Sequence, residues 1–142
     1  MSFTHVNIVS ILIAAIAAWI FGGAYYTALS KPWLAAQGKT LEQCKAEQDA
    51  KSGMAKGAPF VLVFISEIII AWVLYGILTH LSAFTLRAGI ISAALCWFGF
   101  VLTTIATNNA FGGRRVMLTV IDSIAWLGAF VIIGAIVGGW GA

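Results

Sequence analysis

The chain has 142 residues, of which 61% are hydrophobic and only 9% are charged, and its formal net charge is +3. Its mean hydropathy is +0.99. Because soluble domains carry about 25% charged residues, this composition excludes an ordinary water-soluble domain and predicts a membrane protein.

Four apolar segments are long enough to cross the hydrocarbon core of a bilayer, which takes about 20 helical residues. They run approximately over residues 6–28, 59–81, 86–111 and 116–140. Barrel strands are excluded because each segment is about twice the ~10 residues that such a strand needs. We therefore predict an all-α fold in which residues 1–142 form a single bundle of four transmembrane helices. A polar connection, 29–58, follows the first of them.

The first segment is expected to be a retained helix rather than a cleaved signal peptide. Residues 1–5 contain no Lys or Arg, the apolar run exceeds the roughly 7 to 15 residues of a signal peptide, and positive charge follows the run. Small residues recur at every fourth position of this segment, which is typical of helix packing in lipid. They are Ser10, Ala14, Ala18 and Gly22.

The connection 29–58 is predicted to contain one short amphipathic helix. Gly38 interrupts the chain, and the stretch TLEQ at 40–43 has the pattern of a capping box, so the helix should begin there and run to about Lys51. Lysines and acidic residues alternate along it, which indicates a solvated face rather than a basic lipid-binding patch.

Aromatic and basic residues near the expected helix ends are assigned to the membrane interface. They are Tyr25, Tyr26, Trp33, Arg114, Arg115 and Trp126. Seven of the eight Lys and Arg residues lie in the connections after the first and third segments, and only Arg87 lies on the opposite side. The positive-inside rule therefore predicts that these two connections are cytoplasmic and that both termini are outside.

The third and fourth segments carry further stripes of small residues. The fourth contains a GxxxG pattern at Gly134 and Gly138, and the third contains a small and polar stripe. That stripe consists of Ser92, Cys96, Gly99, Thr103 and Thr107. The sequence leaves open whether these stripes pack within one chain or between copies of it.

Two carboxylates interrupt the apolar segments. At ~1.5 Å per residue, Glu67 lies roughly 12 Å and Asp122 roughly 10 Å from the cytoplasmic ends of their helices. A charge at such depth costs at least ~3 kcal/mol, so both side chains should face the bundle interior and pair, accept hydrogen bonds or stay protonated. Arg114 or Arg115 could reach Asp122, whereas Glu67 has no obvious partner.

The third segment is expected to bring polar side chains to the same level, and together with Glu67 and Asp122 they form a predicted buried polar cluster. Its remaining members are Thr103, Thr104, Thr107 and Asn108, with Asn109 beside them.

Three functions are open for this predicted cluster. It could hold the helices together by interhelical hydrogen bonds, or Glu67 could be a proton or cation site of a small transporter or channel. An intramembrane enzyme or lipid head-group site is disfavoured, because His5 and His80 lie at the outer edge, away from both carboxylates.

We favour the transporter or channel, with a structural or accessory membrane subunit as the alternative. The two histidines and two cysteines have no metal-ligand spacing, so we expect no metal. We also expect no catalytic residue, no cofactor and no nucleic-acid partner. The expected partners are the lipid bilayer and further copies of the chain, since four helices leave little room for a pathway within a monomer.

Four stretches of the chain resemble the bacterial membrane family known as domain of unknown function 1761. They are GGAYYTALSKPW at 22–33, PFVLVFISEIIIAWVL at 59–74, WFGFVLTTIATNNAFGGRR at 97–115 and LTVIDSIAWL at 118–127. The resemblance implies four transmembrane helices in a bacterial inner membrane, without an established activity. The positions that match the family pattern are Tyr26, Trp33, Glu67, Thr104, Asn108, Asp122 and Trp126.

Overall fold

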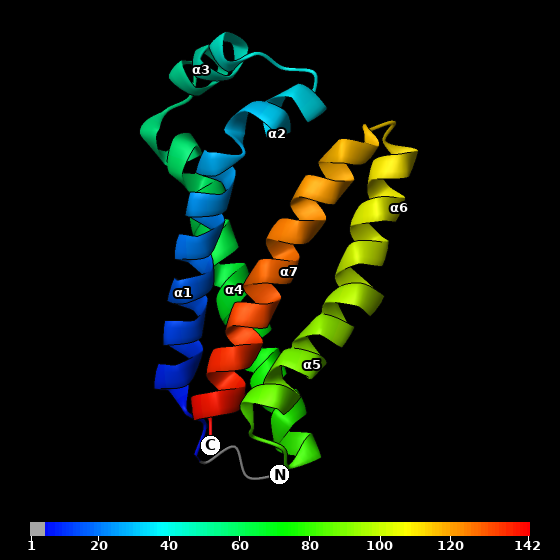
Figure 1. The fold of residues 1–142 in the computed structure, drawn as a ribbon. Coiled ribbons are helices and arrows are strands. Elements are labelled where there is room, and N and C mark those ends of the chain that lie inside the picture. The colour runs from blue at the N-terminus through cyan, green and yellow to red at the C-terminus, as the bar shows by residue number, and fades with distance from the viewer. Residues whose placement is uncertain (1–4) are drawn as a thin grey trace.

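The computed structural model describes residues 5–142, and in this range the chain folds into six continuous helices (Figure 1). Four of them are long and apolar enough to span a membrane. These are α1 (Ile8–Ala28), α4 (Gly53–Leu81), the continuous helix Leu86–Phe111 and α7 (Val116–Trp140). The all-α prediction with four transmembrane helices is confirmed, and the chain is a multi-pass membrane protein.

The helix Leu86–Phe111 is not regular along its length. It consists of α5 (Leu86–Cys96), the π-helical segment η1 (Trp97–Leu102) and α6 (Thr103–Phe111). A π-helix forms i→i+5 hydrogen bonds, so it changes the direction in which all later side chains project. The sequence-based prediction assumed an uninterrupted 3.6-residue period through this region.

Two short helices occupy the connection between α1 and α4: α2 (Ser30–Ala36) and α3 (Leu41–Asp49). The predicted capping box opens α3. The Gln43 backbone N–H donates to the Thr40 hydroxyl at 3.2 Å, and the Gln43 side chain accepts from the Thr40 backbone N–H at 3.0 Å. The helix α2 was not predicted. Leu29, with φ −104° and ψ 19°, is the only residue between α1 and α2 that is not helical, so α2 begins directly after it.

The start of the second transmembrane helix is corrected from residue 59 to Gly53. Ser52 caps α4 by accepting a hydrogen bond from the Ala55 backbone N–H at 3.4 Å. Pro59 therefore lies inside the helix, where transmembrane helices tolerate proline.

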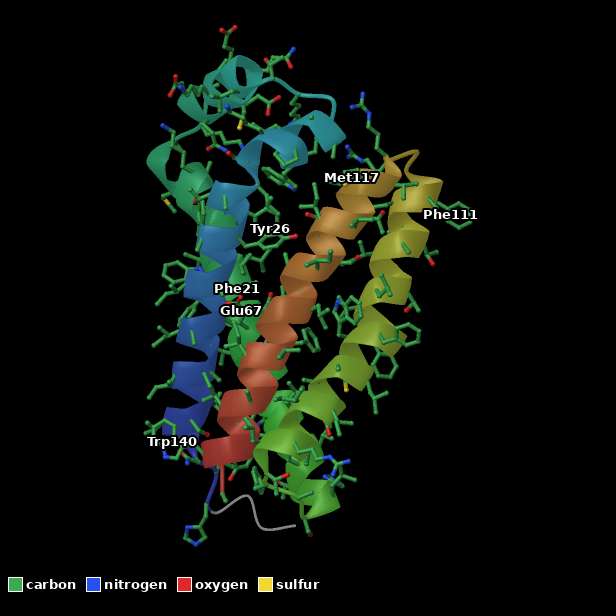
Figure 2. The ribbon with its side chains drawn as sticks, viewed as in Figure 1. Phe21, Tyr26, Glu67, Phe111, Met117 and Trp140 are labelled. Atoms are coloured by element: carbon green, nitrogen blue, oxygen red, sulfur yellow. The ribbon has the colours of Figure 1, made fainter. Side chains whose placement is uncertain are left out.

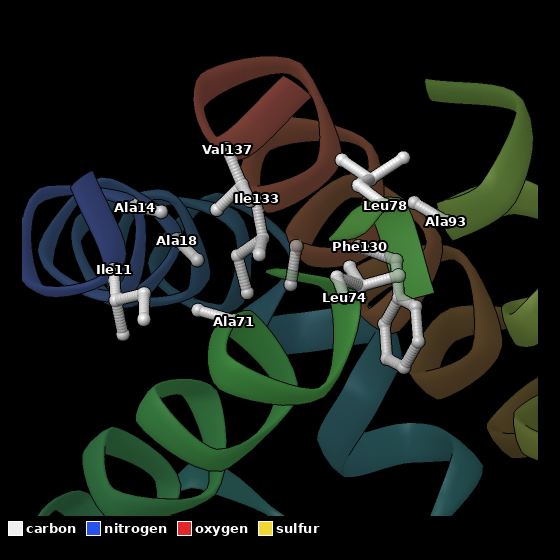
Figure 3. Close-up of a cluster of buried hydrophobic side chains, with 11 residues drawn as sticks. Ile11, Ala14, Ala18, Ala71, Leu74, Leu78, Ala93, Phe130, Ile133 and Val137 are labelled. Atoms are coloured by element: carbon white, nitrogen blue, oxygen red, sulfur yellow. The ribbon is translucent and has the colours of Figure 1, made fainter. Parts of the chain in front are cut away.

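The four long helices pack most closely at the end where α1 begins and α7 ends, which we call the terminal end. Toward the opposite end, the loop end, where α2 and α3 lie, α7 and α6 lean away from α1 (Figure 1). A buried hydrophobic cluster fills the terminal half, with Ile11 from α1, Leu74 and Leu78 from α4, and Ile133 and Val137 from α7 (Figure 3). Outward-facing apolar side chains such as Leu62 and Phe100 are exposed and contact lipid.

The small-residue stripes of α1 and α7 are used within the chain. Ser10, Ala14 and Ala18 are fully buried, whereas a Cβ atom at Gly22 would meet nothing within 4 Å. Gly134 and Gly138 pack against Gly89 of α5. A Cβ on Gly89 would lie 2.9 Å from the Gly134 carbonyl carbon and from the Gly138 Cα atom. No side chain fits between Gly89 and the two glycines of α7, so these residues permit a close approach of the two backbones.

Candidate functional site

Glu67 lies on the inner face of α4, at the level where the packed core ends. The buried residues of α4 are Glu67, Ala71, Leu74 and Leu78, whose spacing places them on one helix face. Toward the loop end, none of the residues 53–66 is buried. Glu67 is therefore the last buried position of α4 in that direction, and Figure 2 shows it among α1, α4 and α7.

The Glu67 carboxyl group has an unusual environment for an acidic side chain. The residue is 2% exposed, and its Oε2 atom is buried without a hydrogen-bond partner. On the terminal side it is followed by the fully buried Ala71, which belongs to the same cluster as Ala14 and Ala18 of α1 (Figure 3). In the described residues the only ion pair joins Lys39 to Glu47, so no cationic side chain neutralises Glu67.

Asp122 has the opposite environment, because two aromatic donors hold it. The Tyr26 hydroxyl donates to Asp122 Oδ1 at 2.8 Å, and the Trp33 indole N–H donates to the same oxygen at 3.1 Å. Beside them, the Tyr25 hydroxyl donates to the Ile121 carbonyl at 2.7 Å. These bonds connect α1, α2 and α7, and we call the group of Tyr26, Trp33 and Asp122 the aspartate clasp.

A second hydrophobic cluster surrounds the clasp at the loop end. Its buried members are Ala36, Leu118 and Ile121, and the partly buried side chains packed on them are Tyr25, Tyr26, Leu29 and Trp33. The ring centroids of Tyr26 and Trp33 are 5.3 Å apart, with the planes at 67°. These aromatic residues were predicted to lie at the membrane interface, and the structure gives them tertiary contacts with α7 as well.

The suggested pairing of Asp122 with an arginine is wrong. Arg114 and Arg115 are both exposed, and the Arg115 guanidinium donates instead to the Ala35 carbonyl at the end of α2. Arg115 reaches this carbonyl because α2 ends beside the start of α7, and the sequence did not predict α2. Trp126 also departs from its interfacial assignment, since it packs against the buried cluster of the terminal half.

The third segment does not contribute to a buried polar cluster as predicted. Thr103, Thr104, Thr107 and Asn108 are all exposed. The hydroxyls of Thr103 and Thr104 donate to carbonyls of their own helix, those of Gly99 and Phe100. The physical reason is η1, because it precedes these residues and turns their side chains away from the direction that a continuous α-helix would give.

Trp97 and Asn109 link this helix to α7. The Trp97 indole N–H donates to the Ser123 carbonyl at 2.8 Å, and the Asn109 amide donates to the Thr119 hydroxyl at 3.0 Å. The Ser123 hydroxyl is buried and has no hydrogen-bond partner. Trp97 and Ser123 lie in stretches that resemble the family pattern, but the sequence did not predict that they meet, because tryptophan and serine are ordinary residues in an apolar helix.

The structure thus separates the two carboxylates into two sites. Glu67 is buried and unpartnered, and in residues 5–142 no hydrogen bond joins it to Asp122 or to any residue of the aspartate clasp. In the same range, no group of three or more His, Cys, Asp and Glu side chains could hold a metal ion.

Comparison with known proteins gives one match. A family model described as protein of unknown function (DUF1761) matches residues 9–138, which is nearly the whole chain and includes Glu67 and the aspartate clasp. Nothing matches among curated proteins or among solved structures.

Proposed function

We propose that the chain, which belongs to the DUF1761 family of proteins of unknown function, moves protons or a proton-linked cation across the membrane. Glu67 is the protonatable site. The observation that supports the proposal is the environment of Glu67: the residue is 2% exposed, lies midway between Gly53 and Leu81 on α4, and has a buried Oε2 atom without a hydrogen-bond partner. Ionisable residues at membrane depth are functional candidates by default.

The chemistry of a buried carboxyl group favours a proton carrier over a structural role. An ionised carboxylate without a counter-ion or a full set of hydrogen bonds is very costly in an apolar environment. We infer that Glu67 holds its proton in this conformation. Releasing the proton then requires a conformation that admits water or a cation to Glu67, and such alternation between states is what a proton-linked transporter needs.

The proposed assembly is a homo-oligomer in a bacterial inner membrane, with the loop end in the cytoplasm. Two observations support the orientation: the Lys and Arg residues of 29–58 and 112–115 lie at the loop end (Figure 1), and Arg87 lies at the other end. We expect a reporter enzyme that works only in the periplasm to be active when fused after Ala142. Activity of a cytoplasmic reporter at the same position would overturn this orientation.

Glu67→Gln tests the transport proposal. Glutamine has nearly the same shape but cannot ionise, so it neither releases nor takes up a proton. We therefore expect purified protein in liposomes to lose its proton or cation flux while its thermal unfolding stays close to that of the unmodified chain. The matched control is Glu47→Gln in α3, an exposed residue paired with Lys39, which should leave the flux unchanged. Equal flux for Glu67→Gln and the unmodified chain would refute the proposal.

The alternative function is a non-catalytic structural or accessory membrane subunit. It is favoured by the aspartate clasp, whose hydrogen bonds tie three helices together and need no transported species to explain them. Under this alternative the unmodified chain produces no flux above empty liposomes, and Glu67→Gln acts only on stability or on the yield of the assembled protein. Both functions assign no catalytic residue to the chain.

A further inference from the structure

We propose that α2 is a latch that closes the loop end of the bundle above Glu67, turning about Leu29 and fastened to α7 through Asp122. The inference depends on the proposed function in one respect only, namely that opening the latch gives access to a transport site. The latch itself is argued from packing and hydrogen bonds.

The bundle needs a closing element at the loop end because two of its helices supply no core there. The buried residues of α1 end at Ala18, and those of α4 begin at Glu67, whereas those of α7 continue to Leu118. Beyond Glu67, α7 is covered on one side by α6, through Asn109, and on the side of Ile121 by the aromatic side chains at the end of α1 and by α2. Figure 1 shows α2 crossing from the end of α1 toward the start of α7.

The contacts that fasten α2 to α7 are few and come from side chains. Trp33 donates to Asp122 at 3.1 Å, Arg115 donates to the Ala35 carbonyl, and the methyl group of Ala36 is buried in the cluster with Leu118. No backbone hydrogen bond joins α2 to α7 in the described residues. The latch can therefore release without unfolding a transmembrane helix.

The backbone on both sides of α2 has the form of two joints. Leu29 is a single non-helical residue between Ala28 and Ser30, and Gly38 has a positive φ of 73°, which glycine adopts without strain. Between these joints α2 is a continuous helix of seven residues, about two turns. Hinges of moving segments consist of a few such positions that absorb the change in φ and ψ.

The closed position also leaves one polar group unsatisfied. The Nε2 atom of Gln37, directly after α2, is buried without a hydrogen-bond partner. Burying an amide in this way costs free energy, and water would recover it when α2 lifts. The closed state is thus held by the aspartate clasp against a local penalty, which is the balance expected of an element that opens and closes.

The latch controls the approach to Glu67. Figure 2 shows Tyr26, Phe21 and Glu67 in this order from the loop end toward the middle of the bundle. The Phe21 ring packs directly on Gly128 of α7, where a Cβ atom would collide with it. Tyr26 is held by its hydrogen bond to Asp122. When α2 lifts, Trp33 leaves both Asp122 and the Tyr26 ring, so Tyr26, the outermost of these layers, loses the aromatic cover on its loop side and keeps only its own bond to Asp122. We infer that water then advances toward the Glu67 carboxyl group.

The test measures access to position 67 directly. In the background Cys44→Ser and Cys96→Ala, which removes both free thiols, Glu67→Cys reports access through its reaction with a membrane-impermeant maleimide supplied on both sides of liposomes. Trp33→Phe removes the indole donor but keeps an aromatic ring. Since it takes away one hydrogen bond to a carboxylate, we expect it to raise the labelling rate about tenfold.

The matched control is Trp19→Phe, which removes an indole hydrogen bond of 3.2 Å to the Phe60 carbonyl, outside the latch, and should leave labelling unchanged. Arg115→Ala releases α2 from the other side and provides a second variant if Trp33→Phe does not fold. Labelling that is the same in both latch variants and in the control overturns the latch. Faster labelling in the latch variants supports it even if the unmodified chain shows no flux, a result that refutes only the proposed function.

Discussion

Replacing Gly134 with alanine is expected to lower the free energy of unfolding by about 3 kcal/mol, although alanine is the better helix former. A Cβ at this position would lie 2.9 Å from the Gly89 carbonyl carbon and 2.6 Å from the Ala93 Cβ, and it would also collide with the Gly89 carbonyl oxygen. Two of these atoms belong to the backbone of α5 and have no rotamer to change. The two helices must therefore move apart, which removes van der Waals contacts along their whole crossing.

The control for this prediction is Gly76→Ala in α4. Gly76 also lies inside a transmembrane helix, but a Cβ there would meet nothing within 4 Å. We expect this variant to be as stable as the unmodified chain or slightly more stable, by up to about 1 kcal/mol, from helix propensity alone. Unfolding in detergent micelles, followed by tryptophan fluorescence, compares the two. Equal losses at both positions would contradict the close α5–α7 packing.

Much of the fold could be predicted because transmembrane helices leave a strong signal in hydropathy. Runs of about 20 apolar residues located all four spans, and local chemistry at 40–43 located the start of α3. The errors have local causes. Pro59 was read as a helix start, although Ser52 caps the helix earlier, and a single non-helical residue, Leu29, was too slight a signal to reveal α2.

The candidate site was only partly predictable. Glu67 and Asp122 could be found because a carboxylate in an apolar run is conspicuous, but their environments depend on contacts between distant residues. Tyr26 and Asp122 are 96 positions apart in the sequence, and no local pattern predicts that they meet. The predicted role of Thr104 and Asn108 failed because η1 interrupts the helical period, and the i→i+5 pattern has no reliable signature in sequence.

The difference between the two carboxylates is the main structural argument about function. A polar group that serves only to hold helices together is expected to have its hydrogen bonds satisfied, as Asp122 has with Tyr26 and Trp33. Glu67 is more deeply buried and has an oxygen without a partner. An unsatisfied buried group calls for an explanation other than stability, and proton transfer at Glu67 supplies one.

Asp122→Ala is expected to lower the free energy of unfolding by about 2 to 3 kcal/mol, because it removes one acceptor shared by two donors and leaves both donors inside an apolar cluster. Asp122→Asn keeps an amide oxygen for Tyr26 and Trp33, so its loss should be about 1 kcal/mol. The measurement is unfolding in detergent micelles, combined with a double-mutant cycle. If the clasp accounts for the loss, Tyr26→Phe should cost much less in the Asp122→Ala background than in the unmodified chain. Equal costs of Tyr26→Phe in the two backgrounds would show that Asp122 stabilises the bundle by some other contact.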